Sequence, residues 1–326
     1  MTNPYLGHPS QLSGVEISRL VGGKGDGMTL MNVRNGLGLE LTVSLDRASD
    51  ISRASLDGVN LGYFAPCGYV HPSYYDKDGA GFLKSFTAGF FTTCGLTAVG
   101  SPCTDEGEEL GLHGTLSNTP CEKYAYDETD DAIVIRTTVR DAALFGRQLL
   151  LERRYTVSKK ENAVYLTDTV TNIGDAVSPY MLLYHCNMGY PLLSENAVVT
   201  IDSLSVTPRN AHAAEDTANC LNMEKPQSGY EERCYYHDIR ADKDGYAEAS
   251  IFNPDIRKGV TIRFDKSTLD RFCEWKMMGR HEYVLGLEPG NCTPDGRDVL
   301  RKNGTLKFLA PEQSAITKVE FHFKRK

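Results

Sequence analysis

The chain has 326 residues, of which 40% are hydrophobic and 24% charged, and its net charge is −8 at pH 7. This acidic balance, without any block rich in Lys and Arg, excludes nucleic acid and anionic membranes as favoured partners. No apolar run approaches the ~18 residues of a transmembrane helix, so the composition is that of a soluble globular protein with a sizeable core.

The first ten residues, MTNPYLGHPS, lack the basic and apolar regions of a secretory signal. The nine cysteines are odd in number and form no CxxC pair. This pattern favours free thiols in a reducing compartment over a disulfide framework or a zinc cluster. We therefore expect a cytoplasmic protein without a resident metal.

Segments in which apolar and polar residues alternate dominate the chain and predict many short β-strands. They lie at 28–33, 39–45, 132–139, 149–157, 163–172, 197–202, 260–264, 305–309 and 316–323. Turn signals separate them, and Asn303-Gly304 predicts a hairpin between VLRK and TLKFL. Almost nothing indicates a long amphipathic helix, so the sequence predicts an all-β protein, a large antiparallel β-sandwich or barrel.

No linker or internal repeat divides the chain. Residues 1–326 are therefore predicted to form a single domain, with 1–27 as an N-terminal extension. Residues 65–121 lack clean alternation and are rich in glycine, aromatic and turn residues. We expect a long ordered excursion there, and such excursions from compact domains are often functional.

Three segments place an ionisable side chain among glycine, proline or apolar residues. GLHG holds His113 between glycines, which predicts a loop or turn with little steric cover. PYMLLYHCN predicts a buried strand with His185 near its far end and Asn187 on the same face. EYVLGLEP predicts a strand that ends near Glu288, and Gly286 on the same face leaves open space beside the carboxylate.

Each segment alone has an ordinary structural explanation, a surface-loop histidine for His113 and a core histidine for His185. No other ionisable groups in the sequence lie in comparably apolar, glycine-flanked segments, which is the reason to consider the three together. They point to an acid and a base acting on a small neutral molecule. No GxSxG motif occurs, and no cysteine is flanked as a catalytic nucleophile would be.

In their order along the chain, these segments resemble the aldose 1-epimerases, or galactose mutarotases. GLHG matches at His113, LTDTVTNIGDAVSPYMLLYH matches at Asn172 and His185, and LGLEPGN matches at Glu288. The motifs DRASDI, TAGFFTTCGL, EWK and YVLGLEPGN resemble more closely a bacterial branch of this superfamily described as a domain of unknown function. These motifs span most of the chain, from residue 46 to residue 291.

The resemblance implies the galactose mutarotase-like supersandwich, a large β-sandwich, and a reaction that opens and recloses a sugar ring without a redox cofactor or metal. It also implies roles: Glu288 as the base, His185 as the acid and His113 as a hydrogen-bonding partner on the ring-oxygen side. Ordinary mutarotases continue the second histidine with an aromatic pair, whereas this chain continues with Cys-Asn-Met at 186–188. That departure indicates a remodelled pocket and leaves the sugar undefined.

Further residues are candidates for substrate binding, although each also has an ordinary structural explanation. Trp275 is favoured because sugars present apolar CH faces that stack on aromatic rings. In a strand, Trp275 and Lys276 face opposite sides, so only one of them can line a pocket. A neutral pyranose or ketose is the expected partner, since few cations are available for an anionic substrate. The candidates are Arg47, Asp50, Asn187, Glu232, His237, Trp275, Lys276, Asn291 and Arg297.

Two alternatives from other classes stay open. A metal-dependent sugar isomerase or lyase would bind a divalent ion through His113, His185 and His237 together with Glu232 or Glu288. Against this alternative, a regular strand would place Glu232 and His237 on opposite faces, and no HxH spacing occurs. A non-catalytic carbohydrate-binding protein would keep an aromatic cleft without depending on Glu288. The sequence does not define the oligomeric state.

Overall fold

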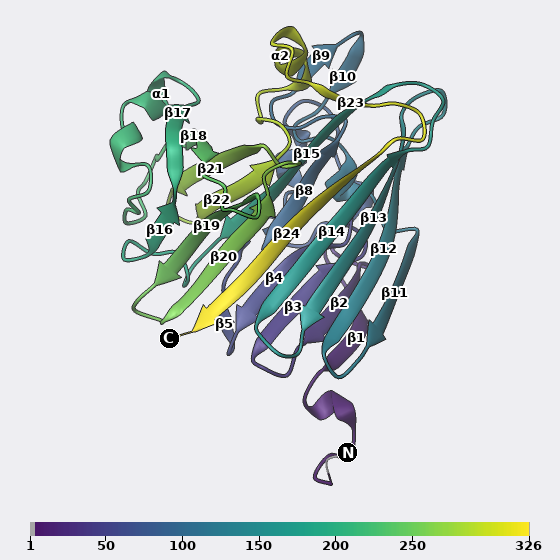
Figure 1. The fold of residues 1–326 in the computed structure, drawn as a ribbon, viewed down its shortest axis with the longest axis vertical. Helices are drawn as coiled ribbons and strands as arrows, with labels where there is room; N and C mark the ends of the chain where they lie inside the picture. The colour runs from purple at the N-terminus through teal and green to yellow at the C-terminus, as the bar shows by residue number, and fades with distance from the viewer. Residues whose placement is uncertain (1–3, 326) are drawn as a thin grey trace.

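Long antiparallel strands account for most of the regular structure in the computed structural model, which describes residues 4–325. Figure 1 shows strands β12, β13, β14 and β24 side by side, in front of strands β1 to β4. Side chains from both layers belong to one continuous hydrophobic core. The predicted all-β class and antiparallel β-sandwich are confirmed. No helix among residues 4–325 is both long and apolar enough to cross a membrane.

The largest sheet has eight strands, and their alternating sequence explains its two faces. In β13, Leu149, Leu151 and Tyr155 point into the core while Glu152 and Arg154 are exposed, as side chains alternate across a pleated strand. In sheet order, the strands are β11 (Lys123–Glu128), β12 (Ala132–Ala142), β13 (Gln148–Ser158), β14 (Ala163–Asn172), β24 (Ser314–Arg325), β20 (Lys258–Asp265), β19 (Tyr246–Asn253) and β16 (Val198–Ile201).

A second sheet carries the strands predicted to hold His185 and Glu288. Its central strand β15 pairs with both β22 and β8, so β15 is buried along almost its whole length. In sheet order, the strands are β17 (Ser203–Pro208), β18 (Arg233–Ile239), β21 (Arg271–Met278), β22 (Tyr283–Gly290), β15 (Ser178–Met188) and β23 (Lys307–Leu309), and β8 (Phe91–Leu96) pairs with β15 beside them.

The N-terminal sheet consists of β1 (Gly14–Arg19), β2 (Thr29–Arg34), β3 (Leu39–Ser44), β4 (Asp50–Leu56) and β5 (Val59–Asn60). Strand β1 lies inside the predicted extension 1–27 and pairs with β2 along its whole length. Residues 1–3 of that extension lie outside the described residues. The division into one domain and an extension stays a prediction.

The excursion at 65–121 contains short elements around the buried strand β8. Within it, β7 (Ala88–Gly89) pairs with β6 (Tyr63–Phe64), which lies just before the excursion, and β9 (Cys103–Asp105) pairs with β10 (Glu108–Leu110). Among residues 4–325, 3₁₀ turns lie at Pro9–Gln11, Pro72–Tyr74, Gly81–Lys84, Leu116–Asn118 and Thr217–Asn219, and the first short α-helix is α1 (Ala211–Ala214). The excursion therefore adds a strand to the second sheet and covers one side of it.

The predicted hairpin at Asn303-Gly304 is wrong, because VLRK belongs to helix α2 (Arg297–Lys302). Asn303 caps this helix and Gly304 follows with a φ of +69°. A glycine in the left-handed region commonly ends a helix, since it accepts that conformation without steric cost. The same two residue types thus serve a helix end as readily as a hairpin.

Candidate active site

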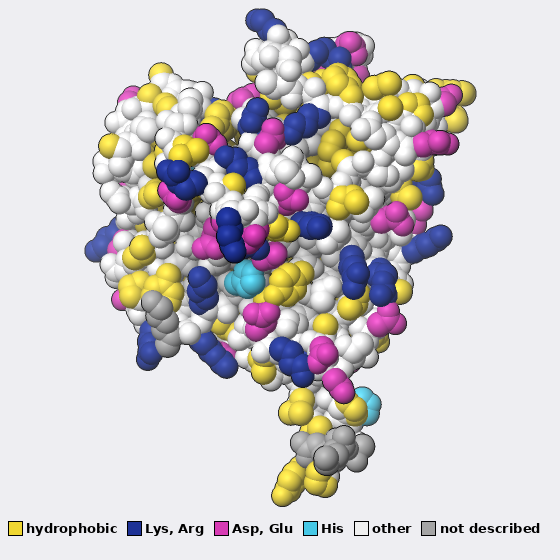
Figure 2. Space-filling view, viewed as in Figure 1, with side chains coloured by type: hydrophobic (Ala, Val, Ile, Leu, Met, Phe, Trp, Pro, Cys, Tyr) yellow, Lys and Arg dark blue, Asp and Glu magenta, His cyan; other side chains and the backbone are white. Residues whose placement is uncertain are grey.

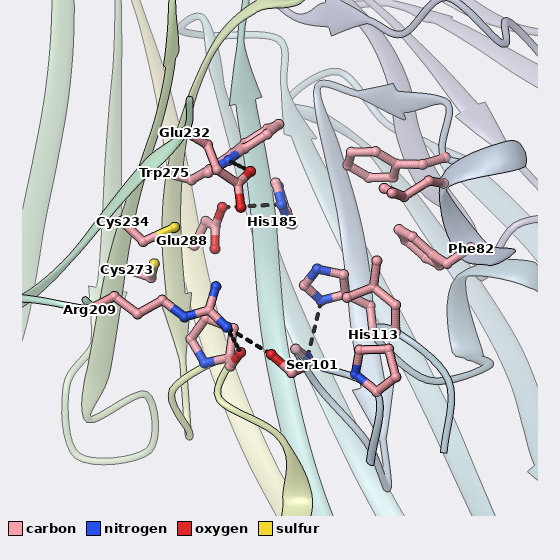
Figure 3. Close-up of a pocket in the computed structure, with 16 residues that line it drawn as sticks. Phe82, Ser101, His113, His185, Arg209, Glu232, Cys234, Cys273, Trp275 and Glu288 are labelled. Atoms are coloured by element: carbon pink, nitrogen blue, oxygen red, sulfur yellow. Dashed lines mark hydrogen bonds and ion pairs between the residues drawn. The ribbon is translucent and has the colours of Figure 1, made fainter. Parts of the chain in front are cut away.

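A cavity of about 260 Å³ lies between the second sheet and the excursion, and all three predicted catalytic residues line it. Glu288 reaches it from β22, His185 from β15 and His113 from the loop after β10. Figure 3 shows the Glu288 carboxylate directed at His185, with His113 on the side of Phe82. The volume is slightly below the ~300–1,000 Å³ typical of drug-sized ligand sites, so it suits a molecule of monosaccharide size.

Strand register brings Glu288 and His185 together. Between β21 and β22, Glu288 lies opposite Cys273, and between β15 and β22, Cys186 lies opposite Leu287. The same register places His185 directly opposite Glu288, so the two side chains lie on one face of adjacent strands, within reach of each other. This contact depends on pairing between segments about a hundred residues apart.

The carboxylate of Glu288 occupies space that Gly286 leaves free. A Cβ at position 286 would lie 2.3 Å from Oε1 of Glu288 and 2.9 Å from Cβ of Trp275. We expect Gly286→Ala to push Glu288 out of position and to lower any turnover that depends on this carboxylate by about 10²-fold, the cost of a misplacement of about 1 Å. Gly7→Ala is a matched control, because the nearest atom to its added Cβ is a side-chain oxygen at 3.5 Å. Steady-state kinetics of both variants test this, and unchanged turnover in Gly286→Ala would contradict it.

Glu288 and His185 form a close, buried pair. Oε1 of Glu288 lies 3.2 Å from Nε2 of His185, and their side chains are only 2% and 7% exposed. The contact lacks hydrogen-bond geometry, which leaves Oε1 without a donor. Burial raises the pKa of Glu288 well above its ordinary value, with Cys234 and Glu232 adding to the rise. Burial lowers the pKa of His185 to about 4. Between these two pKa values the pair holds one exchangeable proton.

His113 is held rigidly rather than left on an open loop, which corrects the expectation of little steric cover. Its backbone has a φ of +60°, and its ring packs against Phe82 and His185 with centroids 5.2 and 5.5 Å away. The Gly100 N–H donates to Nδ1 of His113 over 3.3 Å, so the neutral ring carries its proton on Nε2. Burial, followed by the nearby His185, lowers the pKa of His113 well below 6.5.

Trp275 and Glu232 form one wall of the cavity. Nε1 of Trp275 donates to Oε2 of Glu232 over 2.6 Å, and the indole ring lies edge-on to His185 with centroids 5.1 Å apart. Opposite them, Nη2 of Arg209 donates to Oγ of Ser101 over 2.8 Å and to the Pro294 carbonyl over 3.0 Å. Arg209 is therefore a fixed cation at the rim of the cavity (Figure 3).

A second cavity of about 440 Å³ adjoins the first one. The two share Leu83, Phe86, Glu232 and Trp275 as lining residues. Beyond this shared wall, the second cavity is lined mainly by apolar and aromatic side chains, including Tyr63. The site is thus a pocket that opens into a wider groove.

Arg47 and Asp50 lie outside the cavity, within the core of the sandwich. Oδ1 of Asp50 lies 2.7 Å from Nη1 of Arg153, a side chain with no exposure, and Asp50 also accepts from Thr93. Arg47 donates to the Val70 carbonyl over 3.1 Å. Buried charges require partners, and Asp50 has them in Arg153 and Thr93, whereas Nη2 of Arg47 makes no hydrogen bond.

Five other candidates also lie away from the cavity walls. Each has protein partners. Asn187 donates to the His185 carbonyl, although its Oδ1 makes no hydrogen bond. Asn291 accepts from the Leu182 N–H, and Arg297 pairs with Asp105. His237 and Lys276 occupy the opposite face of the second sheet, beside Glu274 and Glu224 respectively. Asn187 still affects His185, because its hydrogen bonding to that residue partly offsets the lowering of the His185 pKa by burial.

Sequence reasoning missed Arg209 and the cysteines Cys234 and Cys273, which line the cavity side by side. Alternation offered a signal for the cysteines. In RCYYHDI, Cys234 falls on the same face as Tyr236, and in RFCEWKMM, Cys273 falls on the same face as Trp275. Arg209 follows β17 in an irregular segment, and nothing in its local sequence marks it.

The fold is the galactose mutarotase-like β-sandwich, with a histidine–carboxylate pair in its cavity. A proposed aldose 1-epimerase from Klebsiella pneumoniae superposes with a TM-score of 0.91 at 26% identity, over 96% of this chain and 83% of that one. Two further structures share only the fold. Galactose 1-epimerase from Lactobacillus acidophilus has a TM-score of 0.63 at 12% identity, over 96% of this chain and 99% of that one. A galactose mutarotase-like protein from Clostridium acetobutylicum has a TM-score of 0.71 at 12% identity, over 97% of this chain and 100% of that one.

Residues 25–323 match the family model DUF4432, a domain of unknown function. The chain belongs to that family. No curated protein matches it at a significant level.

Proposed function

We propose that this protein interconverts the anomers of a free sugar by acid–base opening and closing of its ring. The observation that carries the proposal is the buried Glu288–His185 pair, 3.2 Å apart, whose two side chains line a cavity of monosaccharide size. Similarity to a proposed aldose 1-epimerase over nearly the whole chain supports it.

The reaction moves one proton from the anomeric hydroxyl to the ring oxygen. Glu288, as a carboxylate, takes the hydroxyl proton, while His185, as an imidazolium, donates a proton to the ring oxygen. The bond between the anomeric carbon and the ring oxygen breaks, and the carbonyl forms. After rotation about the adjacent carbon–carbon bond, the same transfers in reverse close the ring on the other face. Both residues then return to their starting forms.

The pKa shifts of the pair fit this proton balance. Burial disfavours the charged form of each side chain, and ring opening converts the charged pair, carboxylate and imidazolium, into the neutral pair. The low-polarity pocket therefore favours the proton transfer that accompanies opening, whereas a bound sugar hydroxyl stabilises the carboxylate before the step. His113, with its proton on Nε2, donates a hydrogen bond beside the ring oxygen.

A neutral sugar fits the charges of the cavity. Its acidic side chains, Glu288 and Glu232, would repel an anionic substrate. The one arginine among the lining residues, Arg209, is already engaged by Ser101, Pro294 and Asp295, the last with 3.5 Å between Nε and Oδ1. A phosphorylated sugar would need cations that are free to bind it.

Trp275 supplies the apolar surface for a sugar ring. We expect Trp275→Ala to raise KM about fivefold, equivalent to about 1 kcal/mol of lost stacking, with a smaller effect on kcat. Tyr124→Ala, which removes an exposed aromatic ring on β11, is the control and should leave KM unchanged. An unchanged KM in Trp275→Ala would show that the sugar does not stack on this ring.

Polarimetry of freshly dissolved α-anomers tests the proposal over a panel of aldoses and ketoses. We expect the wild-type protein to accelerate equilibration for at least one neutral sugar. Equilibration at the buffer rate across the panel, together with sugar binding measured by calorimetry, would overturn the proposal in favour of a non-catalytic binding protein.

A further inference from the structure

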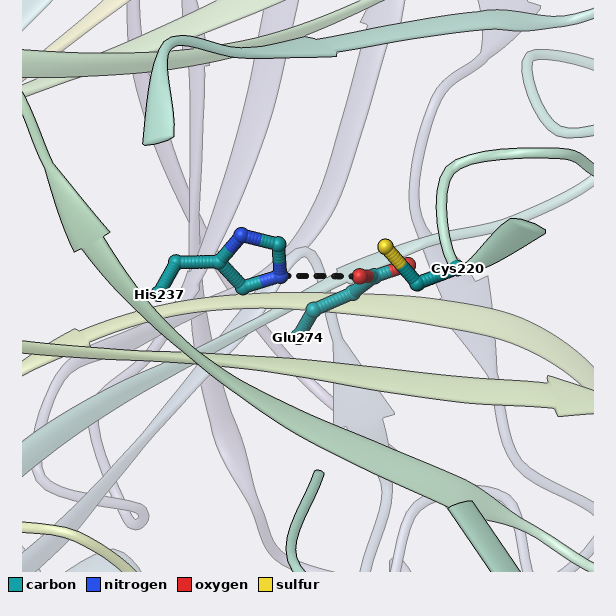
Figure 4. A group of neighbouring side chains, drawn as sticks. All are labelled: Cys220, His237 and Glu274. Atoms are coloured by element: carbon teal, nitrogen blue, oxygen red, sulfur yellow. Dashed lines mark hydrogen bonds and ion pairs between the residues drawn. The ribbon is translucent and has the colours of Figure 1, made fainter. Parts of the chain in front are cut away.

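Three potential metal ligands converge on the side of the second sheet that faces away from the cavity. Figure 4 shows Cys220, His237 and Glu274 directed toward one another. Their ligand atoms all lie within 4.8 Å of one another. His237 and Glu274 have no side-chain exposure, and Cys220 is 6% exposed. Among residues 4–325, no other group of three or more His, Cys, Asp or Glu has this spacing.

Adjacent strands position two of the three ligands. In the pairing of β18 with β21, Tyr235 lies opposite Glu274, and His237 is two residues beyond Tyr235 on the same face. The alternate residues Cys273 and Trp275 point to the other side and line the sugar cavity. Cys220 comes from the turn that follows the 3₁₀ segment Thr217–Asn219.

The hydrogen bonds of this cluster leave one buried acceptor without a partner. Nε2 of His237 lies 3.0 Å from Oε2 of Glu274, while Nδ1 of His237 bonds to Oγ of Ser203 over 2.8 Å. Oε1 of Glu274 is fully buried and no N–H or O–H group donates to it; the Cys220 thiol also faces this carboxylate, as a weak donor. A buried carboxylate oxygen without a donor is costly, so this atom indicates a missing partner.

The charges around Glu274 allow that partner to be a divalent cation. Lys276 is a cation that acts on Glu274, but its Nζ lies 3.0 Å from Oε1 of Glu224 and donates to the Asn222 carbonyl over 2.6 Å. The Lys276–Glu224 ion pair carries no net charge. A divalent ion bound by the carboxylate of Glu274 and the thiolate of Cys220 would be neutral as well, which a buried site requires.

We propose that Cys220, His237 and Glu274 bind a divalent transition-metal ion, with zinc the best match to the thiolate, imidazole and carboxylate donors. His237 binds through Nε2, Cys220 through Sγ after releasing its proton to solvent, and Glu274 through both carboxylate oxygens. The 3.0 Å between Nε2 and Oε2 agrees with bonds of about 2.0–2.2 Å from one ion to each atom. Ser203 fixes the imidazole from behind, as outer partners of metal-bound histidines do.

The ion would be structural, tying the turn at Cys220 to strands β18 and β21. Because these strands carry Cys273 and Trp275 on their other face, it would also hold one wall of the cavity. This inference does not depend on the proposed function, and it concerns the opposite side of the same sheet.

Metal analysis of the full chain as purified, without chelators or affinity metals, tests the inference. We expect about one first-row transition metal, mainly zinc, per chain, with loss of most of it in both Cys220→Ser and Glu274→Gln. Cys103→Ser is the matched control, since this partly exposed cysteine of β9 lies outside the cluster and should leave the metal content unchanged.

Cobalt provides a second readout that identifies the ligand itself. After chelation, Co²⁺ added to the wild-type chain should produce a thiolate-to-cobalt absorption band and raise Tm, because an ion that binds only the folded state stabilises it. Cys220→Ser should lack the band. A wild-type chain that holds no stoichiometric metal and gives no cobalt band would overturn the inference, as would metal retained undiminished in Cys220→Ser and Glu274→Gln.

Discussion

Glu288→Gln is expected to lose anomer interconversion by about 10²- to 10⁴-fold, the usual contribution of a positioned proton-transfer group. Glutamine has nearly the same shape and would still fill the space beside Gly286, but it cannot accept the hydroxyl proton. Glu152→Gln, an exposed change on β13, should retain full activity. Activity of Glu288→Gln within a few-fold of wild type would remove Glu288 from the role of base.

The pH dependence of the stability of Glu288→Gln distinguishes a loss of catalysis from a loss of folding. The folded-state pKa of Glu288 is raised above its ordinary 4.5 by burial. The protonated form therefore stabilises the fold at low pH, and this contribution is lost as pH rises through the folded-state pKa. Glutamine does not ionise. We therefore expect the free energy of unfolding of Glu288→Gln, measured with denaturant, to rise relative to that of wild type as the pH increases from about 4.5. A difference between the two proteins that does not change with pH would mean that the carboxylate is not desolvated.

His185→Gln is the second variant with a large expected effect. Without the imidazole, no group in contact with Glu288 delivers a proton to the ring oxygen, so kcat should fall by about 10²- to 10⁴-fold. His322→Gln changes a partly exposed histidine of β24 and should be silent. If His185→Gln kept wild-type kcat, His113 or water would have to be the acid.

The pH dependence of kcat/KM tests the proposed acid role of His185. The Glu288–His185 pair is active while the two side chains together hold one exchangeable proton. On the acid side, kcat/KM of wild type should therefore decline only near pH 4, where His185 also becomes protonated and the pair holds two. On the alkaline side it should decline when Glu288 loses its proton, above the ordinary range of a carboxyl. An acid limb near 6.5, the value of an unperturbed histidine, would contradict the burial argument.

Local sequence was sufficient to predict the strands that carry Glu288 and His185. Alternation and the proline after Glu288 predicted an extended segment, and the apolar run through His185 predicted a buried one. Gly286 was also interpreted correctly, since its missing side chain makes room for the carboxylate. These features are local because strand geometry fixes which neighbours share a face.

The errors arose where long-range contacts decide a residue's environment. Asp50 could be taken as a substrate ligand because its buried partner Arg153 is 103 residues away. Arg209 was missed because its neighbours, Ser101 and Pro294, come from the excursion and from the segment after β22. Alternation placed Lys276 on the face opposite Trp275, but only the position of the strands in the sheet shows which of the two faces lines the cavity.

NMR exchange spectroscopy at anomeric equilibrium tests most directly whether Glu288 exchanges protons with a bound sugar. With the sugar that wild type equilibrates fastest, we expect exchange cross-peaks between the two anomers, and we expect them to fall to the buffer level with an equal concentration of folded Glu288→Gln. Cross-peaks of equal intensity for the two proteins would contradict the account.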